Sequence, residues 1–163
     1  MKDRIRIGIG YDIHPLTPGR RLVLGGINIP FDKGLGGWSD ADALTHAIID
    51  AMLGAAALGD IGKHFPPGEP QYKGISSLIL LRRVRDKLAA QSWQLENIDA
   101  TVVAEQPRLG DFIDQMRQQL SQTLDIAPDQ VSVKASTSNS LGFIGQGEGI
   151  AVWAVAMIAS ISN

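Results

Sequence analysis

The sequence predicts a single α/β (α+β) domain over residues 1–163, in which a mixed β-sheet is backed by helices on one face. Three observations lead to this prediction. Segments with an apolar period of two alternate along the chain with segments of helical period. The last such segment, residues 150–159, is apolar on both faces, as in a strand covered by a layer or a neighbouring subunit on each side. No linker is long enough to divide the chain into two domains.

The first half of the chain opens with a strand in "RIRIGIG", where isoleucines alternate with other residues up to about Asp12 and His14. The segment "LTPGRR" is a turn, and "LVLGGINIP" reads as a hairpin of two short strands around Gly25 and Gly26. Residues 31–39 contain three glycines and no periodicity, which predicts a mobile loop. Ser39 or Asp40 is expected to cap a helix that runs to about residue 58.

The second half begins with an irregular segment at 59–70, rich in glycine and proline. Helices are expected at 76–91 and around 113–124, since both segments carry apolar residues at helical spacing. Strands are expected at 98–107, 131–137 and 150–160, with a glycine-rich loop at 138–149. Together these elements give a sheet with helices packed against it.

Composition restricts the classes of function. The chain is 44% hydrophobic and 20% charged with a net charge of −2, so no nucleic acid or anionic membrane is expected as a partner. Cysteine is absent, so any zinc ion must be bound by histidine and carboxylate groups. The start "MKDRIRIG" lacks the apolar core of a signal peptide, and the longest apolar run is too short for a membrane span. A cytoplasmic protein is therefore expected.

A metal site is the main chemical hypothesis from the residues themselves. Asp12 and His14 lie two positions apart on a strand and therefore project from the same face. His46 lies on a predicted helix, with Asp42 and Asp50 one turn away on either side. The alternatives are a surface aspartate that orients a histidine, and a buried histidine satisfied by neighbouring acids. One Asp and two His with a free fourth position are typical of catalytic zinc, and Asp42 and Asp50 would then fix the His46 tautomer.

Other glycine-rich segments and the third histidine carry weaker signals. Loops 34–39, 59–69 and 138–149 contain glycines that would let backbone N–H groups approach phosphate oxygens. "GIGYD" lacks the third glycine and the helix of a dinucleotide site. His64 lies in "KHFPP", without a grouping of ligand-type residues comparable to that around His46, and is interpreted as a loop or surface residue.

Five segments together resemble the 2-C-methyl-D-erythritol 2,4-cyclodiphosphate synthase family of isoprenoid precursor biosynthesis: "RIGIGYDIH", "GGINIP", "WSDADALTHAIIDAMLGAAALGDIGKHFP", "NIDATVVAEQPRL" and "VKASTSNSLGFIGQGEGIA". The resemblance covers essentially the whole chain. It implies a homotrimer whose three sheets pack around the trimer axis, with active sites between adjacent subunits. The implied reaction converts 4-diphosphocytidyl-2-C-methyl-D-erythritol 2-phosphate to the cyclic diphosphate and releases CMP. An isoprenoid diphosphate is a possible ligand of the central cavity.

The resemblance also assigns residues. It implies one zinc ion per subunit, bound by Asp12, His14 and His46, and a second cation, Mg²⁺ or Mn²⁺, that bridges the substrate phosphates. The implied catalytic positions are Trp38, Ser39 and Thr137. Asp60 and Gly62 match residues that hold the cytidine ribose, and residues 104–110 match a loop around the cytosine. The full set of implied substrate-binding positions is Asp12, His14, Asp60, Ile61, Gly62, Phe65, Ala104, Pro107, Arg108, Leu109, Gly110, Ser136, Thr137, Ser138, Asn139, Phe143 and Gln146.

Three positions depart from the family pattern. Trp38 stands where the family has a histidine that stabilises the phosphate in the transition state. Asn139 replaces a glutamate that holds the second cation, and Gln146 replaces an arginine that lines the cavity. These departures favour a second hypothesis, a weakly active zinc-binding trimeric paralogue that binds a nucleotide or isoprenoid diphosphate. A generic zinc hydrolase is a third, and the matched nucleotide loop argues against it.

Overall fold

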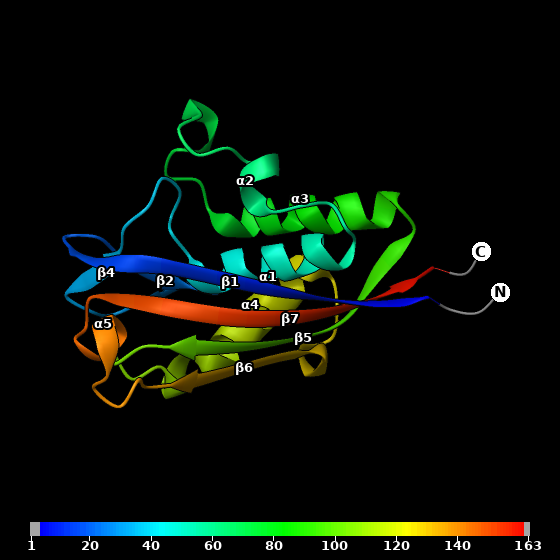
Figure 1. Cartoon of the computed structure of the whole chain (residues 1–163). Helices are drawn as coiled ribbons and strands as arrows, with labels where there is room; N and C mark the ends of the chain where they lie inside the picture. The colour runs from blue at the N-terminus through cyan, green and yellow to red at the C-terminus, as the bar shows by residue number, and fades with distance from the viewer. Residues whose placement is uncertain (1–3, 162–163) are drawn as a thin grey trace.

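The computed structural model describes residues 4–161 and shows a five-stranded sheet beside a two-stranded hairpin (Figure 1). The strand order of the large sheet is β4-β1-β7-β5-β6, and β2 and β3 form the hairpin. The strands are β1 (Ile5–Pro18), β2 (Leu22–Leu24), β3 (Ile27–Ile29), β4 (Lys33–Leu35), β5 (Trp93–Val103), β6 (Val131–Ser136) and β7 (Gly149–Ser160). The α-helices are α1 (Ala43–Ala55), α2 (Ile61–His64), α3 (Ser77–Ala90), α4 (Ile113–Leu124) and α5 (Gly142–Gly145); three short 3₁₀ helices are η1 (Pro70–Tyr72), η2 (Gly110–Phe112) and η3 (Pro128–Gln130).

The large sheet is mixed, as the sequence predicts. Strands β5 and β6 pair in parallel, and helix α4 lies on the crossover between them. The pairs β1–β4, β1–β7 and β5–β7 are antiparallel. Two parallel strands cannot be joined by a tight turn, so they need a long crossover connection such as the one that contains α4. The predicted single-domain α/β fold with a mixed sheet is therefore confirmed.

The two faces of β1 have opposite environments. Gly8 and Gly10 are buried on the face that α1 covers, while Ile7 and Ile9 on the other face are 67% and 70% exposed. A strand with alternating isoleucines would ordinarily turn them toward the core. In β1 the face that carries Gly8 and Gly10 packs against the core instead, because glycine lets the backbone of α1 approach the sheet. Helices α1, α3 and α4 lie together on this face of the sheet (Figure 1).

The contact between α1 and β1 is a backbone-to-backbone approach. A Cβ atom placed on Gly10 would lie 1.8 Å from the Ala47 carbonyl oxygen, and one on Gly8 would lie 2.0 Å from the Ala51 carbonyl oxygen. Across the sheet, Gly10 pairs with Ala154, which pairs in turn with Ala100. This row of small residues is what allows helix α1 to press closely onto the centre of the sheet.

Several element boundaries differ from the sequence-based expectation. Strand β1 continues to Pro18, so Asp12 and His14 lie within the strand and not at its end. The expected mobile loop at 31–39 contains β4, because residues 33–35 pair with the second half of β1. Such a tertiary pairing leaves no periodic pattern in three residues. Strand β5 covers Trp93–Val103 rather than 98–107, and α5 forms within the glycine-rich loop.

Helix α1 begins and ends inside the predicted segment. Its N-cap is Asp42, not Ser39 or Asp40, because the Asp42 carboxylate accepts a hydrogen bond from the Thr45 backbone N–H. The helix ends at Ala55, three residues before the predicted end. The amphipathic predictions for the other two long helices are confirmed, since Leu80, Leu81, Val84 and Leu88 of α3 and Met116, Leu120 and Leu124 of α4 are buried. No helix within residues 4–161 is long and apolar enough to cross a bilayer.

Candidate functional site

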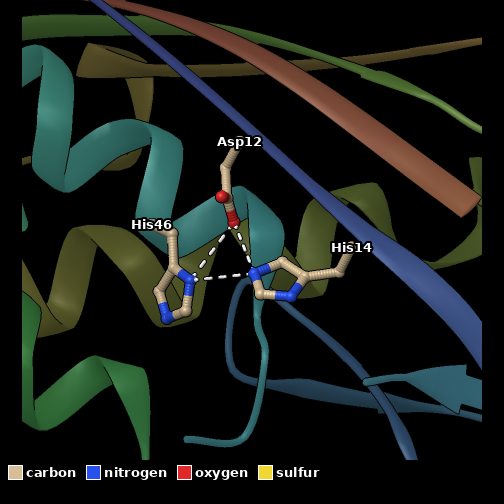
Figure 2. A group of neighbouring side chains, drawn as sticks. All are labelled: Asp12, His14 and His46. Carbon is tan, nitrogen blue, oxygen red and sulfur yellow. Dashed lines mark hydrogen bonds and ion pairs between the residues drawn. The ribbon is translucent and has the colours of Figure 1, made fainter. Parts of the chain in front are cut away.

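Asp12, His14 and His46 converge at the junction of β1 and α1 (Figure 2). The Asp12 Oδ2 atom lies 2.8 Å from His14 Nε2 and 3.2 Å from His46 Nδ1, and the two imidazole nitrogens are 3.4 Å apart. The i, i+2 spacing on β1 places Asp12 and His14 on the same face as Gly8 and Gly10, toward the helix. The close approach of α1 then brings His46 to them.

The donor set of this cluster fits a zinc ion. Two imidazole nitrogens and one carboxylate oxygen are the ligand atoms that zinc takes in proteins without cysteine. The Nδ1–H group of His14 donates to the Gly36 carbonyl oxygen at 2.7 Å, which leaves the Nε2 lone pair directed at Asp12. Lone pairs that face one another across about 3 Å repel unless a proton or a metal cation lies among them. A cation at the centre satisfies all three groups.

The surroundings of Asp12 favour its ionised carboxylate beside a positive charge. Burial by itself would raise the pKa of Asp12, but in the metal-free cluster a proton shared with His14 or His46, together with the charge of these imidazoles, outweighs burial and lowers that pKa. Burial by itself would lower the pKa of His14, but its hydrogen bond and charge interaction with Asp12 raise that pKa. The site therefore stabilises an anionic carboxylate beside positive charge, whether the charge is a proton or a metal ion.

Asp42 and Asp50 do not contact the His46 imidazole, so the expectation that they fix its tautomer is wrong within the described residues. Both Asp42 oxygens accept hydrogen bonds from backbone N–H groups of Gly25 and Gly26, at 2.9 and 2.7 Å. Asp50 accepts a hydrogen bond from the Ile61 backbone N–H at 2.7 Å. Burial raises the pKa of both carboxyl groups. Asp42 thus ties the hairpin to the start of α1, and Asp50 ties α1 to α2.

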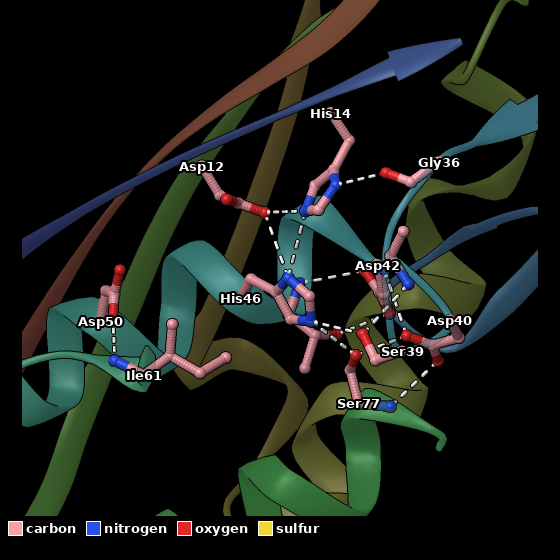
Figure 3. Close-up of polar contacts among 12 residues, drawn as sticks. Asp12, His14, Gly36, Ser39, Asp40, Asp42, His46, Asp50, Ile61 and Ser77 are labelled. Carbon is pink, nitrogen blue, oxygen red and sulfur yellow. Dashed lines mark hydrogen bonds and ion pairs between the residues drawn. The ribbon is translucent and has the colours of Figure 1, made fainter. Parts of the chain in front are cut away.

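The groups that do contact the far side of His46 are serines (Figure 3). His46 Nε2 lies 2.8 Å from Ser77 Oγ and 3.3 Å from Ser39 Oγ. Ser77 is fully buried at the first turn of α3 and also hydrogen-bonds Asp40. No sequence pattern indicates Ser77 or the Asp40 side chain, because the His46–Ser77 and Asp40–Ser77 contacts join residues 31 and 37 positions apart.

A pocket surrounds the cluster and contains several of the expected substrate-binding residues. Trp38 lines it, and its indole N–H donates to the Glu69 carbonyl oxygen at 2.9 Å, which links two loops above the cluster. Asp60 is exposed and caps α2 through the Lys63 backbone N–H. His64, expected in a loop or at the surface, is the last residue of α2 and is half-buried, with Nε2 2.9 Å from the Leu58 carbonyl oxygen. The lining residues are Asp12, His14, Trp38, Ser39, His46, Ile61, Gly62, Phe65, Pro67, Tyr72 and Leu80.

A second pocket gathers the residues expected around the cytosine and the phosphates. It is lined by Ala104, Glu105, Pro107, Arg108, Leu109, Gly110, Ile113, Ala135, Ser136 and Thr137. Its neighbouring loop is held by Glu105, whose carboxylate accepts hydrogen bonds from the backbone N–H groups of Ser138 and Ser140, both at 3.1 Å. Between them, Asn139 adopts a left-handed conformation with φ of 50°. Asparagine tolerates this conformation better than most residues.

The two pockets are separate within one chain. Asp12 pairs with Val152, Val152 with Val102, and Val102 with Ala135, so three strand spacings lie between the candidate metal site and the end of β6. At about 4.8 Å per spacing this is roughly 14 Å. Phe143 and Gln146 lie outside both pockets and are exposed.

Comparisons with known proteins agree on one family. A model described as the YgbB family matches residues 5–159. A 2-C-methyl-D-erythritol 2,4-cyclodiphosphate synthase of Dehalococcoides mccartyi (strain CBDB1) is 58% identical over 154 residues, which cover 94% of this chain and 98% of that protein. The enzyme of the same name from Moorella thermoacetica is 54% identical, with 94% of each chain covered.

Solved structures show the same fold. The bifunctional IspDF from Campylobacter jejuni superposes with a TM-score of 0.95 at 38% identity over 99% of this chain, which spans 44% of that longer chain. A CDP complex of IspF from Plasmodium falciparum superposes with a TM-score of 0.86 at 32% identity, covering 99% of this chain and 100% of that one.

Proposed function

This chain belongs to the YgbB family, whose matched relatives are 2-C-methyl-D-erythritol 2,4-cyclodiphosphate synthases, and on this premise we propose how its own residues carry out the reaction. The enzyme is a lyase of isoprenoid precursor biosynthesis. It converts 4-diphosphocytidyl-2-C-methyl-D-erythritol 2-phosphate to 2-C-methyl-D-erythritol 2,4-cyclodiphosphate and releases CMP. The observation that carries the residue assignment is the convergence of Asp12, His14 and His46 in the lining of one pocket.

In the reaction, an oxygen of the substrate's 2-phosphate forms a bond to the β-phosphorus. The bond from that phosphorus to the bridging oxygen breaks, and the bridging oxygen leaves with CMP. The attacking phosphate is already anionic at neutral pH, so the protein needs no strong base. Its residues have to hold two anionic groups in line and offset the charge that builds up between them.

Asp12, His14 and His46 are proposed to bind one zinc ion, and their donor atoms suit it. A zinc ion held there would supply Lewis-acid chemistry for the phosphate that is attacked, and a second divalent cation, Mg²⁺ or Mn²⁺, would help to offset the charge of the substrate phosphates. Ser39, which lines the same pocket, and Thr137, in the second pocket, are the proposed hydroxyl donors to the phosphates. Trp38 contributes packing to the pocket, since its N–H group is occupied by the Glu69 carbonyl.

The nucleoside half of the substrate is proposed to bind at loop segments on both pockets. Asp60 and Gly62 would hold the ribose, and the Asp50 carboxylate supports this segment through the Ile61 N–H. Residues 104–110 would enclose the cytosine. The CDP named in the Plasmodium falciparum complex is consistent with such a nucleotide site.

The active site is proposed to lie between subunits of a homotrimer. A separation of three strands between the two pockets supports this, since one chain alone does not bring both halves together. The uncovered sheet face supports it as well, because Ile5, Ile7, Ile9, Tyr11, Trp153 and Val155 on β1 and β7 are exposed. A contiguous apolar surface of this kind is typical of a subunit interface. Phe143 and Gln146 would then line a central cavity suited to an isoprenoid diphosphate. The enzyme is proposed to be cytoplasmic.

The test is CMP release from the CDP-linked substrate, combined with metal analysis. Wild-type protein is expected to release CMP and to carry about one zinc ion per chain. His46→Ala is expected to lose both, while His64→Ala, a histidine outside the cluster, keeps both. A His46→Ala protein that retains full zinc would contradict the residue assignment, even if CMP release by the wild type upholds the reaction.

A further inference from the structure

The hydrogen bonds around Ser77 determine which nitrogen of His46 carries a proton (Figure 3). The Ser77 hydroxyl donates to Asp40 Oδ1, and the two oxygens of Asp40 also accept from the backbone N–H groups of Asp42 and Ser77, at 3.1 and 2.9 Å. Asp40 is thus an acceptor at both oxygens. A serine hydroxyl has one proton, so Ser77 Oγ can only accept in its 2.8 Å contact with His46 Nε2.

A proton on His46 Nε2 has a direct consequence for the cluster. In the neutral ring, Nδ1 then carries a lone pair, and this is the atom that lies 3.2 Å from Asp12 Oδ2 and 3.4 Å from His14 Nε2. The opposite tautomer would turn an N–H group toward the same centre. His14 is fixed in a corresponding way by the Gly36 carbonyl oxygen, although through its Nδ1 atom.

We propose that Ser77, oriented by Asp40, is a positioning residue that holds His46 as the Nε2–H tautomer and so presents Nδ1 to the metal. The proposal rests on the proposed metal site. Three features give the contact its strength: Ser77 is fully buried, its backbone N–H is also tied to Asp40, and it starts helix α3, which packs against α1. Ser39 Oγ, at 3.3 Å from the same nitrogen, is the weaker partner.

The experiment measures zinc affinity by competition with a chelator, in Ser77→Ala and in two matched variants. Loss of a side chain that orients a metal-binding histidine typically weakens affinity by about 10–100-fold, and this is expected for Ser77→Ala. Ser121→Ala removes another buried hydroxyl, one bonded to the Gln118 carbonyl, and is expected to leave affinity unchanged. Ser39→Ala is expected to have a smaller effect than Ser77→Ala.

A second measurement holds even if Ser77→Ala fails to fold. The chain has three histidines, so ¹⁵N-labelled imidazoles in the zinc-loaded wild type give a spectrum that can be assigned. His46 is expected to show a slowly exchanging Nε2–H and a metal-bound Nδ1. A metal-bound Nε2, or Ser77→Ala with wild-type affinity, would overturn the proposal. A wild-type protein that binds no zinc would instead refute the proposed metal site on which this inference depends.

Discussion

Replacing Gly10 with alanine tests whether the close approach of α1 to β1 is what brings Asp12, His14 and His46 together. The added Cβ would lie 1.8 Å from the Ala47 carbonyl oxygen, and real Cβ contacts essentially never fall below 3.0 Å. Helix α1 and strand β1 must therefore separate by about 1.2 Å, the difference between these two distances. Ala47 follows His46 directly, so the same movement carries His46 away from Asp12 and His14.

The expected cost follows from the atoms that clash. Overpacking typically costs about 1–3 kcal/mol, and the upper end is expected here because the opposing atoms are helix backbone that cannot rotate away. For a chain of this size, about 3 kcal/mol corresponds to a fall in melting temperature of roughly 6–12 °C. Displacing a catalytic group by about 1 Å can reduce the rate about 100-fold, so CMP release is expected to fall by that order.

The assays are thermal melting, zinc competition and CMP release on Gly10→Ala and on a control, Gly54→Ala. Gly54 lies in α1 itself, and the nearest non-helix atom to its added Cβ would be the Ile9 carbonyl oxygen at 3.8 Å, an ordinary contact. Alanine there is expected to stabilise by about 0.5–1 kcal/mol, since glycine is a poor helix former. Wild-type stability and zinc affinity in Gly10→Ala would refute the reasoning.

Three further predictions concern the pH dependence of stability, the second cation and the subunit interface. Burial raises the pKa of Asp50, so its stabilising contribution is complete below the unfolded value of about 3.9 and is lost as the pH rises through the folded pKa. In melts of zinc-free protein, Asp50→Asn should therefore gain stability over wild type between pH 4 and pH 7, and a pH-independent difference would argue against this. Asn139→Glu should lower the Mg²⁺ concentration that gives half-maximal CMP release, because Mg²⁺ prefers a carboxylate oxygen; an unchanged requirement would mean that the loop is compensated elsewhere. Ile7→Glu places a charge on the exposed sheet face and should convert the proposed trimer to monomers in light scattering, whereas a variant that is still trimeric would exclude this face as the interface.

The sequence predicts the placement of Asp12 and His14 well because the signal is local. The spacing of Asp12 and His14 on a strand places both side chains on one face without knowledge of the fold. It does not reveal which face is covered: the isoleucines of β1 suggest a core face, yet they are exposed, and the glycines lie against the helix. That inversion depends on the approach of a helix from elsewhere in the chain.

The residues that contact Nε2 of the His46 imidazole, by contrast, could not be predicted from the sequence. Asp42 and Asp50 have the right helical spacing but are used for the hairpin and for α2. The groups that contact His46 Nε2 include Ser77, which comes from a different helix. Helical periodicity predicts which residues share a face, whereas the identity of a neighbour across a helix–helix contact requires the tertiary structure.

The most direct test of the metal assignment is anomalous diffraction at the zinc absorption edge from crystals of the zinc-loaded protein. One peak per chain is expected, about 2.0–2.2 Å from Asp12 Oδ2, His14 Nε2 and His46 Nδ1. A principal peak away from these three atoms, or a peak bonded to His46 through Nε2, would contradict it.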